Sequence, residues 1–137
     1  MKIRAFLLSG FLAVAAALSA ANETTAKAEP APRYDKSAEI DLMAVVTDAR
    51  EVSRDAPLIG IYISVRSESD APFEIYLGPS DFVKGFEITF NKGNRVHIFG
   101  SKVKVGGNSV VLAREVRKNE STLYLRDLKG EPYWTVK

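Results

Sequence analysis

Cysteine is absent from the 137 residues of this chain, and histidine occurs once. Without cysteine no disulfide framework can form, so stability has to come from the core. A zinc site made of protein ligands draws on several histidines or cysteines, and a nucleophilic triad needs a base beside its nucleophile. The single His97 alternates with apolar Val96 and Ile98, which predicts an exposed strand residue. We therefore expect a protein that is not an enzyme, with no metal and no cofactor.

The apolar run near the N-terminus is too short for a membrane span. Lys2 and Arg4 precede an apolar stretch over residues 5–18, and small residues follow at positions 19–21. This is the order of a secretory signal peptide, whereas a membrane span needs about 20 apolar residues. No cysteine follows that could carry a lipid anchor. We predict a signal peptide over residues 1–21, a flexible linker over 22–37, one domain over 38–137, and a periplasmic or secreted location.

An excess of one charge is also lacking once the signal peptide is removed. The loss of Lys2 and Arg4 leaves 17 basic and 17 acidic side chains. A neutral domain has no general attraction to phosphates, so we expect no nucleic-acid partner. The charge is nevertheless divided, with a net −6 over residues 22–83 and +6 over residues 84–137. Either the two halves compensate each other in one compact domain, or the second half supplies a basic patch for an anionic partner.

Short alternations of apolar and polar residues follow one another from Glu39 onward, which is typical of antiparallel strands. The expected strands lie near residues 40–47, 59–66, 73–77, 96–105, 110–116 and 123–125, with a short helical turn over 80–85, a bulge at 100–101 and a hairpin turn at 106–108. Three strands, a short helix and further strands are the order of a small OB-type barrel. We predict an all-β, OB-like barrel of five to seven antiparallel strands with one short helical turn. An eight-strand sandwich is the alternative.

Several short motifs carry a family resemblance. They lie at residues 76–82, 100–103, 113–116 and 125–127, and Gly130, Pro132 and Trp134 follow. Together they resemble those of small exported bacterial proteins of uncharacterised function. The resemblance covers residues 40–134 and implies an OB-like barrel. It implies no chemistry, because no established activity belongs to these motifs.

Arg114 is the most unusual charged residue of the predicted barrel. It alternates in register with Val110, Leu112 and Val116, which places it on the core-facing side of its strand. If residues 118–121 form the connection to the last strand, Arg114 and Asp127 are diagonal neighbours on one face. Two interpretations remain open. Arg114 forms a structural ion pair at the barrel end, or it binds an anion in the barrel mouth.

Two tyrosines form a second candidate site. Tyr62 and Tyr76 fall on the outer face of two strands joined by a tight turn, and that face commonly binds ligands in OB domains. With Ser69 at the centre of the turn the two rings are directly opposed, whereas a register shifted by two residues places Tyr76 against Ser64. In either register Arg66 flanks the aromatic surface. This arrangement predicts an aromatic and basic platform for ligand stacking. In the competing interpretation the pair stabilises the sheet, or it packs beneath the N-terminal segment.

Trp134 is the only tryptophan and lies near the end of the chain. We expect it to cover the open end of the barrel, or alternatively to anchor a partner.

We predict an exported, non-catalytic binding module that uses Tyr62, Arg66, Tyr76 and Arg114 for an unknown small ligand or envelope protein. One alternative is a structural or assembly subunit that docks through a strand edge or Trp134, and a second is an enzyme with an unfamiliar site.

Overall fold

The computed structural model describes residues 32–135, and the predicted signal peptide and most of the predicted linker lie outside them. The elements in chain order are the 3₁₀ turn η1 (Lys36–Ala38), β1 (Glu39–Val52), β2 (Gly60–Ser67), β3 (Pro72–Gly78), the helix α2 (Ser80–Lys84), β4 (Arg95–Val105), β5 (Asn108–Lys118) and β6 (Ser121–Tyr124). The predicted all-β class with a short helix is therefore confirmed. No helix among the described residues is long and apolar enough to cross a membrane.

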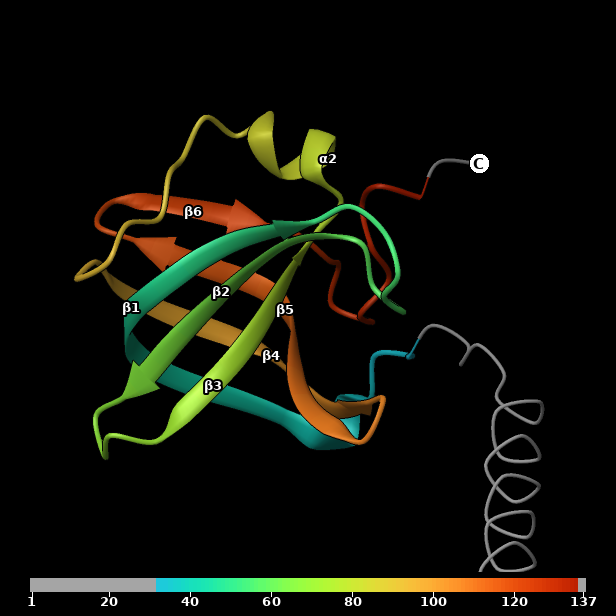
Figure 1. Cartoon of the computed structure of the whole chain (residues 1–137), viewed down its shortest axis with the longest axis horizontal. Helices are drawn as coiled ribbons and strands as arrows, with labels where there is room; N and C mark the ends of the chain where they lie inside the picture. Colours follow the sequence, from blue (N-terminus) through green and yellow to red (C-terminus); the bar gives the residue numbers. More distant parts are fainter. Residues whose placement is uncertain (1–31, 136–137) are drawn as a thin grey trace, which may run out of the picture.

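The strands form one six-stranded sheet in the order β3-β2-β1-β4-β5-β6. All neighbours in this order are antiparallel, and a short parallel pairing of β3 with β5 closes the sheet into a barrel (Figure 1). The helix α2 connects β3 to β4 and lies across one end of the barrel. The strand order and the helix between β3 and β4 are compatible with the predicted OB-like barrel. The parallel β3–β5 pairing departs from the prediction that all strands are antiparallel.

Two hydrophobic clusters lie on opposite faces of the strands. The barrel core holds the inward-facing residues of each strand, including Val46, Ile63, Ile75, Ile98, Val116 and Leu123, which are fully buried. A second cluster, here called the outer cluster, consists of Leu58, Tyr62, Tyr76, Val105, Val110 and Leu112. Since successive side chains of a strand point to opposite faces, the residues of β2, β3 and β5 divide between the two clusters.

A bulge in β5 determines which of its side chains face the barrel core and which face outward. Phe99 pairs with Glu115 but Gly100 pairs with Ala113, so Arg114 is the extra residue of the ladder. The bulge was expected in β4 at residues 100–101, but the inserted residue belongs to the opposite strand. Arg114 consequently does not share a face with Val116, and its predicted place on the core-facing side is wrong.

Candidate functional site

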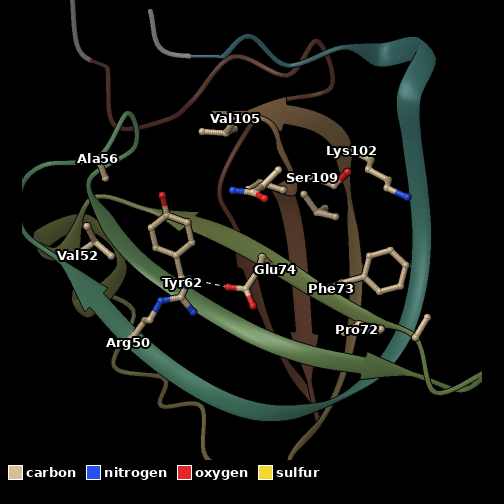
Figure 2. Close-up of a pocket in the computed structure, with 14 residues that line it drawn as sticks. Arg50, Val52, Ala56, Tyr62, Pro72, Phe73, Glu74, Lys102, Val105 and Ser109 are labelled. Carbon is tan, nitrogen blue, oxygen red and sulfur yellow. Dashed lines mark ion pairs between the residues drawn. The ribbon is translucent and has the colours of Figure 1, made fainter. Parts of the chain in front are cut away.

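A groove of about 740 Å³ lies between β3 and β5 on the barrel surface. The parallel ladder that joins these strands has two pairs among the described residues, Ile75–Val111 and Tyr76–Leu112. Beyond it the strands diverge and leave the groove open (Figure 2). Its walls come from the end of β1 and the connection after it, from β2 and β3, and from the β4–β5 hairpin. The lining residues are Arg50, Val52, Ala56, Tyr62, Ala71, Pro72, Phe73, Glu74, Lys102, Val105, Asn108, Ser109, Val110 and Val111.

A polar network lies at one wall of the groove. Arg50 forms an ion pair with Glu74 at 2.6 Å, and its guanidinium lies 4.9 Å from the centre of the Tyr62 ring (Figure 2). Ser64 joins the two charged groups, because its hydroxyl donates to Glu74 at 2.6 Å and accepts from Arg50 at 3.2 Å. This network fixes the side chains of three neighbouring strands on the rim of the groove.

At the other end of the groove the exposed Lys102 lies over the ring of Phe73, with 5.5 Å between its ammonium nitrogen and the ring centre. Figure 2 shows the two side chains projecting toward each other from opposite walls. Since the charges of Arg50 and Glu74 compensate each other, Lys102 leaves the groove with one net positive charge.

The backbone edges of β3 and β5 also face the groove. The amide of Ser67 donates to Ala71, so by antiparallel alternation the N–H of Glu74 points away from β2. Val105 and Asn108 flank a two-residue turn and form the first hydrogen-bonded pair of the β4–β5 ladder. The next pair, Lys104 with Ser109, is therefore not hydrogen-bonded, and the N–H and C=O groups of Ser109 point away from β4. Glu74 and Ser109 both lie beyond the ladder between β3 and β5. The groove therefore offers backbone hydrogen-bonding groups on two sides.

The two predicted tyrosines meet as expected but are covered. Tyr62 and Tyr76 are directly opposed, with ring centres 5.2 Å apart in an edge-to-face arrangement. They are only 7% and 4% exposed, and their hydroxyls donate to the carbonyls of Leu58 and Ile59 at 2.7 and 2.6 Å. The predicted exposed platform is wrong. The tyrosines belong to the outer cluster, against which Tyr34 of the N-terminal segment packs.

Arg66 does not flank the tyrosines. Its side chain is 51% exposed, forms an ion pair with Asp70 at 3.4 Å, and lines a small hollow beside Met43 and Val45. The position over the Tyr62 ring is taken by Arg50 instead. The prediction missed Arg50 because β1 extends to Val52, beyond the expected end of the first strand.

Arg114 is neutralised by acidic partners other than the predicted Asp127. It forms ion pairs with Glu39 at 3.3 Å and Glu115 at 3.7 Å, and its side chain is 17% exposed. Asp127 instead accepts the backbone N–H groups of Lys129 and Glu131. The structural interpretation of Arg114 as a paired ion is therefore favoured over an anion site, although the predicted partner is wrong.

Trp134 and His97 also have neighbours within the barrel. Trp134 packs against Tyr76 and Phe82, with ring centres 6.4 and 5.4 Å apart, and so covers the region between the outer cluster and α2. His97 forms a hydrogen bond with Asp41, and its ring lies tilted against that of Phe99, with ring centres 4.4 Å apart. Among the described residues, no group of three or more acidic, histidine or cysteine side chains is arranged to hold a metal ion.

Comparison with known proteins gives one family. The model of the MamS/MamX magnetosome protein family matches residues 44–123, which run from the middle of β1 into β6 and include both strands that border the groove. No curated protein and no solved structure matches the chain.

Proposed function

The chain belongs to the MamS/MamX magnetosome protein family, and from this membership and the geometry of the groove we propose a magnetosome-associated assembly subunit. It binds an extended segment of a partner protein between β3 and β5. The proposal keeps the predicted binding role of the β2–β3 face but moves the contact surface from the tyrosine pair to the groove beside it. This is also the place, between the loops after the first and fourth strands, where OB folds bind ligands.

One observation carries the proposal: the β3–β5 ladder ends after two residue pairs and leaves two strand edges facing an open groove. An extended peptide adds to such an edge by main-chain hydrogen bonds, while its alternate side chains enter pockets. Here the apolar floor of Tyr62, Val105 and Val110 receives an apolar side chain, and Lys102 attracts an acidic neighbour. A peptide is favoured over a small ligand because the edges present backbone groups along their length.

Two further parts of the proposal rest on the sequence. The N-terminal segment supports export before assembly, to the periplasm or beyond the cell. The lack of histidine and cysteine clusters supports a non-catalytic role.

Site-specific photo-crosslinking tests the groove. A photoreactive residue at Ser109, which is exposed and lines the groove, should crosslink to a discrete partner in magnetosome-forming cells. The same residue at the exposed Lys92, which lies outside the groove, serves as the matched control. The expected result is a partner band at position 109 that is absent at position 92. Equal capture at both positions would contradict the proposal.

Hydrogen exchange then distinguishes strand addition from loose contact. With a synthetic peptide from the crosslinked partner segment, the amides of Glu74 and Ser109 should become protected, because they bond to the added strand. Lys102→Glu should weaken this binding about 3- to 10-fold if the peptide carries an acidic residue there. Binding without protection of the two amides would place the partner on another surface.

A further inference from the structure

Arg126 is a buried cation without a carboxylate at ion-pair distance among residues 32–135, and Glu131 acts on it only from further away. It follows β6, is 9% exposed, and has no carboxylate oxygen within 4.0 Å of its guanidinium in the described chain. Its Nη1 donates to the carbonyl of Gly130 at 3.0 Å, and its Nε is buried without a hydrogen-bond partner. Buried charges are normally paired with an opposite charge. Arg126 departs from that rule, whereas Arg114 obeys it.

Aromatic rings hold the guanidinium in place. Its carbon lies 5.0 Å from the ring centre of Trp134 and 5.6 Å from that of Tyr34. These contacts offset part of the cost of burying the charge, because aromatic faces attract cations. They do not offset all of it, since burial still lowers the pKa of Arg126 below its ordinary value. The side chain is therefore held ready to bind an anion.

The guanidinium lines a hollow of about 510 Å³ that is separate from the groove between β3 and β5. Arg33 and Lys129 add two exposed positive charges to its rim, against the single acidic side chain of Glu131. Tyr76 and Leu58 supply apolar surface to its wall. The hollow thus combines a net positive charge with an apolar wall.

We propose that this hollow binds a small organic anion, with its carboxylate or phosphate group on Arg126 and its apolar body against Tyr76 and Leu58. Paired charge-assisted hydrogen bonds from a guanidinium suit both oxyanions. The rim charges of Arg33 and Lys129 attract the ligand, and the rings of Tyr34 and Trp134 fix the orientation of the guanidinium. The site does not depend on the groove or on its partner, so the two proposals can fail independently.

An NMR titration of the protein with three probes tests the site. Benzoate carries a carboxylate on an apolar ring, inorganic phosphate is an anion without an apolar body, and benzyl alcohol is a neutral ring of similar size. We expect benzoate to shift the Trp134 indole and Arg126 Nε–H signals saturably and phosphate to shift them more weakly. Benzyl alcohol should leave them unchanged at the same concentration. Equal shifts with benzoate and benzyl alcohol, or no saturation with either anion, would overturn the proposal.

Substitution of the rim avoids disturbing the buried arginine. The double variant Arg33→Gln, Lys129→Gln removes two exposed charges, so it should fold normally and weaken benzoate binding about 3- to 10-fold. The matched control, Arg66→Gln with Lys92→Gln, removes two exposed charges outside the hollow and should leave the affinity unchanged. Equal weakening in both variants would mean that net charge, not this site, attracts the anion.

Discussion

The buried hydroxyl of Tyr76 makes the stability of the outer cluster depend on pH. Its ring is buried, and burial raises the pKa of Tyr76 from 10.0 to about 12. Burial, assisted by a hydrogen bond to Glu39, likewise raises the pKa of Tyr34 to about 12. A raised pKa means that the folded state keeps its proton after the unfolded state has lost it. Both tyrosines therefore contribute stability that is fully present below pH 10 and is lost as the pH rises toward 12.

The variant Tyr76→Phe should distinguish two contributions of this hydroxyl to stability, its hydrogen bond and its loss of a proton at high pH. At pH 8 we expect the variant to lose about 1–2 kcal/mol of unfolding free energy, because the carbonyl of Ile59 loses its donor. Above pH 10 the wild type should decline more steeply than the variant, because the variant lacks one of the three tyrosine hydroxyls whose pKa is raised in the folded state. Urea unfolding followed by circular dichroism between pH 8 and 11.5 measures both effects. Tyr124→Phe, on an exposed ring, is the control and should leave stability at pH 8 unchanged.

Among the elements, the β4–β5 pair depends on a close approach at Gly100. A Cβ added there would collide with the carbonyl oxygen of Leu112 and lie 3.0 Å from the Cα of Ala113, next to the bulge at Arg114. These two obstacles are backbone atoms, which cannot move without shifting the strand, and the side-chain Cγ1 of Val111 lies 2.9 Å from the same added Cβ.

Gly100→Ala should therefore destabilise the barrel by about 1–3 kcal/mol through overpacking. Gly85→Ala is the matched control, because Gly85 has ordinary helical backbone angles and the nearest atom to its added Cβ is 3.3 Å away. We expect its effect to stay below about 1 kcal/mol. Urea midpoints of the two variants provide the test, and equal loss in both would show that β5 can shift to accommodate a side chain at position 100.

The sequence predicts the elements of this barrel better than their side-chain partners. Alternation identifies the strands and turn residues identify the hairpins, because these signals are local. They leave two registers for the β2–β3 hairpin, and the structure shows the one in which Tyr62 faces Tyr76. The partner of Arg114 could not be predicted, because a single inserted residue in β5 changes the face on which it lies. Arg126 was missed for a different reason: its aromatic neighbours, Tyr34 and Trp134, come from opposite ends of the chain and lie in segments without periodicity.

At the scale of the whole molecule, the segment before β1 and the segment after β6 both cover the outer cluster. Tyr34 and Trp134 pack against it from the N-terminal and C-terminal segments, and Tyr34 lies against Gly130. Asp35 anchors the N-terminal segment, because its amide donates to the hydroxyl of the buried Ser101 at 3.0 Å and its carbonyl accepts from it at 2.8 Å. Neither Tyr34 nor Trp134 is among the buried residues of the barrel core, although Trp134 also packs against it, so the outer cluster should open before the barrel unfolds.

A chain that begins at Glu39 should test this division. It loses both hydrogen bonds to Ser101 and the packing of Tyr34, so we expect about 2–4 kcal/mol less unfolding free energy than in a chain that begins at Asn22. The far-ultraviolet circular dichroism should persist, because the barrel core is intact. Trp134 fluorescence should shift to the red, because loss of Tyr34 opens the hollow that both residues line. Equal stability and fluorescence in the two chains would show that residues 32–35 contribute nothing to the closure of the outer cluster. Loss of all β-sheet signal would show instead that the barrel and the outer cluster unfold as one unit.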